Sequence, residues 1–164
     1  MSVSIRVATS GDAAAIAAIY APFVLNSTVT FELEPPDAAE IAQRIASVHE
    51  RGLPYLIAER NSEVVGYAYA TPFRPRPGYR FTVEDSVYVR EGHAGQGIGR
   101  TLLRELIARC RAAGSRQMLA VIGGANPASM ALHGGAGFVH AGVLKDVGFK
   151  LGEFRDVTMM QLAL

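Results

Sequence analysis

The feature that most constrains the fold of this chain is a glycine-rich turn between a strand pattern and an amphipathic helix. The segment VYVREGHAGQGIGRTLL, residues 87–103, has glycines at positions 92, 95, 97 and 99. The helix that follows has an apolar stripe made of Ile98, Leu102, Leu103, Leu106, Ile107 and Cys110. Glycines let backbone N–H groups converge without side chains in the way, and a helix N-terminus carries a partial positive charge. The turn therefore predicts a pyrophosphate site, to which Arg100 would add a charged contact.

Two widespread phosphate-binding motifs do not fit this turn. A dinucleotide motif, G-x-G-x-x-G, requires a sixth-position glycine, but counting from Gly95 or Gly97 leads to Arg100 or Leu102. A Walker A loop requires Gly-Lys-Ser/Thr, which is absent from the sequence. The plain alternative is a turn whose glycines serve backbone geometry alone.

The patterns along the whole chain predict a mixed α/β domain. Strands are expected at 3–7, 55–59, 64–70, 81–89, 117–122, 138–143 and 156–162. Helices are expected after Asp12, after the Asp37 cap, at 98–114 and at 127–136, with loops at 26–33 and in the proline-rich stretch 71–80. This order is not a regular β-α alternation, and it favours a single domain over residues 1–164 with a mixed sheet and helices on both faces.

Composition excludes several classes of protein. Hydrophobic residues make up 49% of the chain and charged residues 19%, which suits a packed core, and the formal net charge of +1 predicts neither a nucleic-acid nor a membrane partner. The chain has one cysteine, which excludes an internal disulfide and a zinc site with several cysteines. His49, His93 and His140 do not have the spacing of metal ligands, so no metal is expected. No apolar run approaches the roughly 20 residues of a membrane span, and the first residues lack a signal-peptide pattern. A cytoplasmic protein is the expectation.

The glycine turn also resembles a family motif. The GNAT superfamily of acyl-CoA N-acyltransferases carries Arg/Gln-x-x-Gly-x-Gly/Ala here, and its backbone amides hold the CoA pyrophosphate; Gly97 and Gly99 match, whereas Ala94 replaces the Arg/Gln. Downstream, the segment from Asn126 to Phe138 resembles the family's Asn…Leu-Tyr…Gly-Phe pattern. His133 stands where the family usually has a Tyr that protonates the departing thiolate. The resemblance implies an acetyl-CoA-dependent N-acetyltransferase with a GNAT-type mixed, splayed β-sheet flanked by helices on both faces.

A narrower resemblance covers most of the chain. The segments 27–31, 73–80, 82–89 and 148–150, together with Leu132-His133 and the Gln161-Leu162 ending, are similar to the phosphinothricin and methionine sulfoximine N-acetyltransferase group. Members of that group acetylate the α-amino group of small amino-acid analogues and resemble one another in forming homodimers. Both properties are therefore implied for this chain.

The resemblance also implies site residues, carried over by position. The acetyl-CoA site would consist of Val87, Tyr88, Val89, Gly95, Gln96, Gly97, Ile98, Gly99, Arg100 and Asn126. The substrate site would consist of Phe31, Arg74, Pro75, Arg76, Tyr79, Glu84, Asp85 and Ser86. Arg74 or Arg76 would clamp a substrate carboxylate, although arginines in such a loop are often plain surface charges. Phe31 and Tyr79 have an equally good interpretation as ordinary packing residues.

The chemistry of amine acetylation points independently to Glu84. An ammonium substrate must lose a proton before it attacks a thioester, so a carboxylate beside the reacting groups is the expected general base. Beside an apolar cofactor arm the pKa of Glu84 would rise; the alternative is a solvated strand carboxylate. His133 is a candidate acid for the thiolate, and a capping or core histidine is the other interpretation.

The sequence favours direct transfer in a ternary complex, because it offers no nucleophile–base pair for an acyl-enzyme. Two alternative functions stay open at this point. One is an N-acetyltransferase for protein N-termini or another amine such as a polyamine, although the basic loop speaks against polyamines. The other is a non-catalytic acyl-CoA-binding module. Two departures from the family pattern favour it: Ala94 at the Arg/Gln position, and His133 where the family usually has a Tyr.

Overall fold

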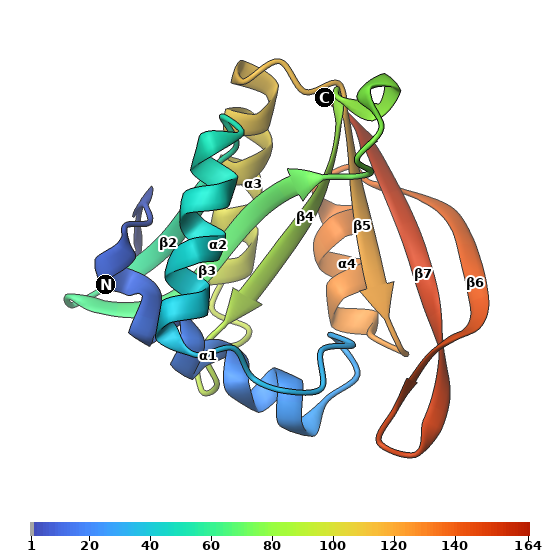
Figure 1. Cartoon of the computed structure of the whole chain (residues 1–164), viewed down its shortest axis with the longest axis horizontal. Coiled ribbons are helices and arrows are strands. Elements are labelled where there is room, and N and C mark those ends of the chain that lie inside the picture. The colour runs from blue at the N-terminus through green and yellow to red at the C-terminus, as the bar shows by residue number, and fades with distance from the viewer. Residues whose placement is uncertain (1) are drawn as a thin grey trace.

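The computed structural model describes residues 2–164 and is built around a seven-stranded sheet with the strand order β1-β2-β3-β4-β5-β7-β6 (Figure 1). The strands are β1 (Ser4–Val7), β2 (Tyr55–Arg60), β3 (Glu63–Pro72), β4 (Thr82–Val89), β5 (Gln117–Gly123), β6 (Val139–Lys150) and β7 (Glu153–Ala163). The helices are α1 (Ala13–Asn26), α2 (Ala38–Glu50), α3 (Ile98–Ala112) and α4 (Pro127–Gly135), with short 3-10 turns η1 (Ser10–Asp12) and η2 (Pro77–Tyr79). None of these helices is long and apolar enough to cross a membrane.

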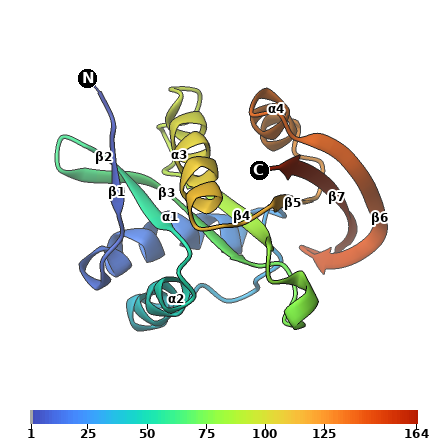
Figure 2. The ribbon, with the colours of Figure 1, turned by 90° about the horizontal axis from the view of Figure 1, so that it is seen from above.

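Helices cover both faces of the sheet. Seen from above, α1 and α2 lie on one face and α3 and α4 on the other (Figure 2). Each layer has its own core: α1 and α2 pack on Tyr55, Ile57 and Tyr67, while α3 packs on a second cluster that includes Leu56 and Ala68. The alternation of neighbouring β2 residues between the two cores is the period-2 pattern of a strand buried on both sides. The predicted α/β class with a mixed sheet is confirmed.

The sheet divides at β4 and β5. These two strands are its parallel pair, and they are paired only from Thr82 opposite Gln117 to Asp85 opposite Ala120. Beyond that point β4 stays paired with β3 and β5 with β7, so the facing edges of β4 and β5 have no strand partner within residues 2–164. We call this opening the fork.

The helix that borders the fork is shaped by its sequence as expected. Its apolar stripe is buried, with Leu102, Leu103 and Leu106 fully inaccessible, which fixes α3 against the sheet. The helix begins at Ile98, directly after Gly97, whose backbone is left-handed with φ 79°. That conformation costs a residue with a side chain about 1–2 kcal/mol.

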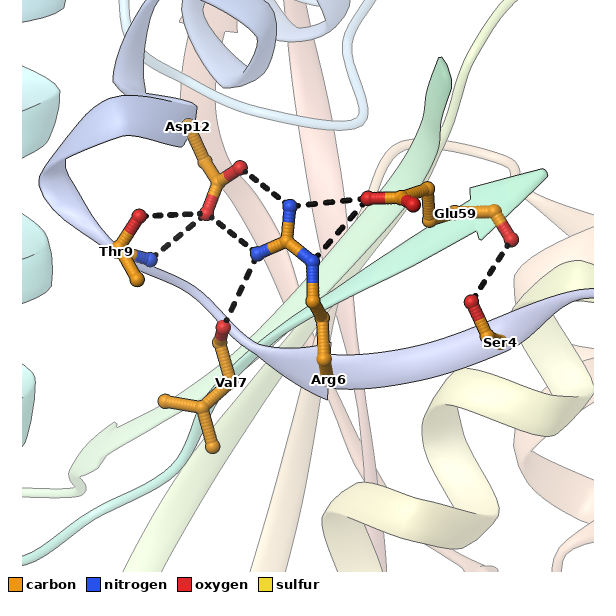
Figure 3. Close-up of polar contacts among 6 residues, drawn as sticks. All are labelled: Ser4, Arg6, Val7, Thr9, Asp12 and Glu59. Atoms are coloured by element: carbon orange, nitrogen blue, oxygen red, sulfur yellow. Dashed lines mark hydrogen bonds and ion pairs between the residues drawn. The ribbon is translucent and has the colours of Figure 1, made fainter. Parts of the chain in front are cut away.

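A polar cluster fastens the N-terminal strand to the rest of the sheet (Figure 3). The guanidinium of Arg6 donates to both carboxylate oxygens of Asp12 at 2.9 and 3.0 Å and to Glu59 Oε2 at 3.0 Å. Asp12 is buried and also accepts from the backbone N–H of Thr9 at 2.8 Å. The Arg6 hydrogen bonds hold the pKa of Asp12 below its ordinary value despite burial, so this carboxylate is charged in the folded protein.

The final two strands are longer than the sequence pattern predicts. The expected spans 138–143 and 156–162 become Val139–Lys150 and Glu153–Ala163. The pairing between β6 and β7 shifts register between His140 and Gly142 and again between Leu144 and Gly148. Such irregularities interrupt the apolar–polar alternation from which strand ends are predicted, which accounts for the difference.

Candidate active site

A cavity of about 1620 Å³ occupies the fork and is lined from both faces of the sheet. On one side its walls come from the glycine turn, from α3 with Arg100 and Arg104, and from α4 with the Asn126 that caps it. On the other side they come from α1 and the loop after it, including Tyr20 and Phe31. The residues of β4 from Glu84 to Val89 and those of β5 from Ala120 to Gly123 form the edges of the fork. The two sides of the sheet thus meet in one space, where two different molecules can approach each other.

The glycine turn has the properties of an anion cradle. Gly95 and Gly97 have φ angles of 75° and 79°, and a Cβ on either would project into open space. In the part of the chain that the structure describes, no side chain caps the start of α3. The N–H groups of its first turn have no partner within the helix and are therefore available to an anion. Arg100 lies exposed in this first turn and lines the cavity. The residues present therefore fit the pyrophosphate site predicted from the sequence.

The edge of β4 continues the cradle toward the fork. Val87, Tyr88 and Val89 line the cavity, and on the β5 side no strand among the described residues pairs with their backbone groups. Asn126 lies across the opening at the start of α4, where its Oδ1 accepts from the N–H of Ser129 at 3.0 Å. This free strand edge can pair with an amide-containing ligand arm, because backbone N–H and C=O groups need partners when they are covered.

Glu84 is placed where the fork closes. It lines the cavity one residue before the last β4–β5 pair and is half-buried. Burial raises its pKa above the ordinary value, and the charge of Asp85 adds to the effect. Within residues 2–164 no ion pair or side-chain hydrogen bond occupies its carboxylate. Glu84 can therefore accept a proton from a group in the cavity.

Asp85 and His133 lie together on the side of the sheet opposite Glu84. Asp85 is buried, and its Oδ2 is 2.8 Å from His133 Nε2. The other ring nitrogen, Nδ1, is 2.7 Å from the carbonyl oxygen of Ser129. Both residues line the cavity, but both nitrogens of His133 are already engaged in hydrogen bonds. Asp85 was predicted together with Glu84 and Ser86 as facing the substrate, and strand alternation separates it from them.

Part of the predicted substrate site does not line the cavity. Arg74, Pro75, Arg76 and Tyr79 lie exposed in the loop that precedes β4, next to the stretch where β4 and β5 are still paired. The guanidinium of Arg74 stacks on the rings of Phe73 and Tyr79, 5.0 and 5.6 Å from their centres. Within a single chain the side chains of this loop pack against one another and do not reach the cavity. The binding of a substrate carboxylate by Arg74 or Arg76 therefore stays a prediction.

Gln96, expected in the cofactor site, also points elsewhere. Its Oε1 accepts from Arg60 Nη1 at 2.5 Å and its Nε2 donates to the carbonyl of Gly92 at 3.3 Å. These contacts tie the glycine turn to the β2–β3 hairpin. Gln96 therefore stabilises the glycine turn through these two hydrogen bonds, and it is not one of the residues that line the cavity.

The loop from Ser27 to Leu33 is held over the cavity by residues that sequence reasoning did not identify. The buried ammonium of Lys150, at the end of β6, donates to the carbonyl of Thr30 at 2.7 Å. Arg44 from α2 donates to both carboxylate oxygens of Glu32, at 2.5 and 3.0 Å. Phe31 is pressed against Gly148, where a Cβ would collide with its ring. Gly148 and Lys150 lie far from this loop in the sequence, and the only signal for them was the Gly-Phe-Lys segment at 148–150.

Comparison with known proteins identifies the family. The model of the acetyltransferase (GNAT) family matches residues 17–138. The chain is 52% identical over 162 residues to phosphinothricin N-acetyltransferase of Alcaligenes faecalis, covering 98% of this chain and 82% of that protein. It is 42% identical over 165 residues to L-methionine sulfoximine/L-methionine sulfone acetyltransferase of Pseudomonas aeruginosa, covering 100% and 96%.

A solved structure agrees with these relatives. The crystal structure of a GNAT superfamily phosphinothricin acetyltransferase from Sinorhizobium meliloti, in complex with acetyl-CoA, superposes with a TM-score of 0.96. It is 47% identical in sequence, and the match covers 100% of this chain and 89% of that one. The chain belongs to the GNAT family of acetyltransferases. The predicted family, fold and enzyme class are confirmed.

Proposed function

We propose that this enzyme transfers the acetyl group of acetyl-CoA to the α-amino group of a small amino acid or amino-acid analogue of the phosphinothricin or methionine sulfoximine type. The observation that carries the proposal is the fork: an anion cradle at one end, a free strand edge along it, and an unpaired carboxylate where it closes. The names of the relatives support the substrate class.

Each part of the fork has a role in this reaction. The cradle from Gly95 to Arg100 holds the pyrophosphate of the donor, and the edge of β4 from Val87 to Val89, with Asn126 opposite, holds its amide arm. The amine approaches from the other face of the sheet, between Phe31 and Ser86, which both line the cavity. This arrangement brings amine and thioester together at the closed end, as direct transfer requires.

Glu84 supplies the proton chemistry. Its carboxylate takes one proton from the substrate ammonium, directly or through a water, and leaves the nitrogen lone pair free to attack the thioester carbon. A C–N bond forms, the C–S bond breaks and the thiolate leaves with its electron pair, and the second proton that the attacking nitrogen must lose passes to that thiolate, so that the products are the amide and the CoA thiol. The raised pKa of Glu84 suits a base that must also release its proton near neutral pH.

Two further properties belong to the proposal. A homodimer is supported by the exposed apolar side chains of β6 and β7, among them Val139, Leu144, Phe149 and Phe154, since surface patches of this kind are commonly covered by a partner. A cytoplasmic location is supported by the single free cysteine, Cys110, which is buried in the core. Light scattering of the purified protein tests the dimer, and a monomer would remove that part of the proposal.

The release of free CoA thiol from acetyl-CoA tests the proposed reaction. The panel of amines contains phosphinothricin, methionine sulfoximine, natural amino acids, spermidine and a short peptide. We expect turnover with the first two or their close relatives. Turnover confined to the peptide or to spermidine would overturn the substrate class, and none with any amine, with acetyl-CoA still raising the melting temperature, would favour a binding module.

A further inference from the structure

Asp85 and His133 form a buried pair at the point where the sheet divides. Asp85 is the last residue of β4 paired with β5, and His133 comes from α4, which lies across the opening. Only 1% of the Asp85 side chain and 6% of the His133 side chain are exposed. The ring of His133 is held further by an edge-to-face contact with Phe138, 4.9 Å between centres. The pair is thus fixed in one geometry between the two halves of the fork.

The hydrogen bonds of this pair determine how many protons it carries. The carbonyl oxygen of Ser129 can only accept, so Nδ1 of His133 bears a proton and donates it across 2.7 Å. Nε2 faces Asp85 Oδ2 at 2.8 Å, a distance that requires a second proton between the two atoms. Without it, a nitrogen lone pair and a carboxylate oxygen would face each other in a buried site. Imidazole is the more basic group, so the second proton resides on Nε2 and the pair is an imidazolium–carboxylate ion pair.

The surroundings of the pair favour the same state. Burial alone would lower the pKa of His133, but the hydrogen bond and charge of Asp85 outweigh it and raise that pKa above its ordinary value. The other titratable groups that the Asp85 charge reaches are Glu84, next to it in β4, and Cys110 from α3. Burial, with the Asp85 charge adding to it, raises the pKa of Cys110 to about 12. Cys110 is therefore uncharged, and Glu84 is the group whose protonation is coupled to the pair. Asp85 Oδ1 is buried and has no hydrogen-bond partner among the described residues, so its only bonded partner there is His133.

We propose that Asp85 is a positioning residue for the acetyl transfer: it fixes His133 in the doubly protonated form and holds the charged ring at the fork. The inference rests on the proposed function, which places the thioester at the fork. As the C–S bond breaks, negative charge develops on sulfur, and a fixed imidazolium in the wall of the cavity stabilises it. Asp85 acts through His133 and itself touches no reacting atom.

The experiment combines nitrogen NMR of the histidine rings with kinetics. Replacing His49, His93 and His140 by Gln one at a time assigns their signals, so the fourth belongs to His133 even if a His133 variant does not fold. In the wild-type protein at pH 7.5 we expect both His133 nitrogens to be protonated. In Asp85→Asn the carboxamide can still donate to Nε2, so the ring keeps its place but should be singly protonated, and kcat should fall roughly tenfold or more.

A matched variant and two contrary results make the test decisive. Asp156→Asn breaks a different ion pair, 2.8 Å from Lys145 on the β6–β7 hairpin, and should change neither the His133 signals nor kcat. A singly protonated His133 in the wild-type protein, or a doubly protonated one in Asp85→Asn, would overturn the inference. An Asp85→Asn variant with the expected spectrum but unchanged kcat would remove its role in transfer. The spectra need no substrate, so they decide the state of the pair even if no tested amine is acetylated.

Discussion

The left-handed backbone at Gly97 makes a prediction that can be worked from the structure. Gly97 has φ 79° and Gly99, two residues later, has an ordinary helical backbone. An alanine at position 97 must adopt a left-handed conformation that costs about 1–2 kcal/mol, although its Cβ would meet nothing within 4 Å. An alanine at position 99 would make an ordinary contact with Leu132 at 3.6 Å and gain about 0.5–1 kcal/mol of helix propensity.

The two substitutions should therefore have opposite effects on stability. For a chain of this size, 1 kcal/mol corresponds to roughly 2–4 °C of melting temperature, so Gly97→Ala should melt roughly 2–8 °C lower and Gly99→Ala at or slightly above the wild-type temperature. Urea titration gives the free energies of unfolding and thermal denaturation the melting temperatures. Gly52→Ala is the matched control, since Gly52 has φ 70° and equally open space but lies in the turn after α2.

Binding separates the cradle from mere backbone strain. Gly97→Ala should also raise the KM for acetyl-CoA, because the new methyl projects into the open space of the cradle, whereas Gly52→Ala should lose stability alone. Equal stability of Gly97→Ala and Gly99→Ala would refute the backbone argument. An unchanged KM in Gly97→Ala would refute the assignment of this turn to the pyrophosphate.

Three further predictions concern the anchor of the N-terminal strand and the loop over the cavity. Asp12→Asn should lower the free energy of unfolding by about 1 kcal/mol at pH 7, since it removes a buried charge-assisted hydrogen bond to a half-exposed arginine. Because the pKa of Asp12 is lowered in the folded protein, the stability that its charge contributes is present above the ordinary Asp range and is lost as pH falls through the pKa of the folded state. Urea titrations at several pH values measure the difference in unfolding free energy between the wild type and Asp12→Asn, and a difference that grows toward acid pH would contradict this argument. Lys150→Met should raise the amine KM severalfold without changing that of acetyl-CoA, because Thr30 loses its anchor, and the exposed Lys145→Met should change neither. Gly148→Ala should also raise the KM for the amine, because the new Cβ would collide with the ring of Phe31. In the control Gly142→Ala the new Cβ meets only open space, so its kinetics should not change. Equal kinetics of the two variants would show that Phe31 does not shape the amine site.

The sequence predicts best what depends on local periodicity. The stripe of α3 is predicted residue by residue and is buried as expected, and Asp37 caps α2 by accepting from the N–H of Glu40 at 2.8 Å. Strand β4 is predicted to within one residue. These features depend on side chains a few residues apart, which a single sequence displays directly.

What the sequence does not display is contact between distant segments. Asp85 and His133 are 48 residues apart, and Lys150 reaches the Thr30 carbonyl across 120 residues. The fork itself depends on where the pairing of β4 with β5 stops, which no local pattern specifies. Asp85 was grouped with Glu84 and Ser86 by resemblance, and only the fold shows that it lies on the opposite face of the strand, where α4 supplies its partner His133. The role of the loop with Arg74 and Arg76 in substrate binding was predicted from resemblance, and within a single chain neither residue lines the cavity.

The pH dependence of acetyl transfer, compared between the wild-type enzyme and Glu84→Gln, tests the central claim that Glu84 accepts the proton at the closed end of the fork. We expect kcat/KM of the wild type to rise with pH through a pKa above the ordinary value of a glutamate, because burial and Asp85 disfavour its charged form. Glu84→Gln should lose roughly 100-fold or more in kcat while its affinity for acetyl-CoA, measured by calorimetry, stays the same. A Glu84→Gln enzyme with wild-type kcat and an unchanged acid limb would contradict the account.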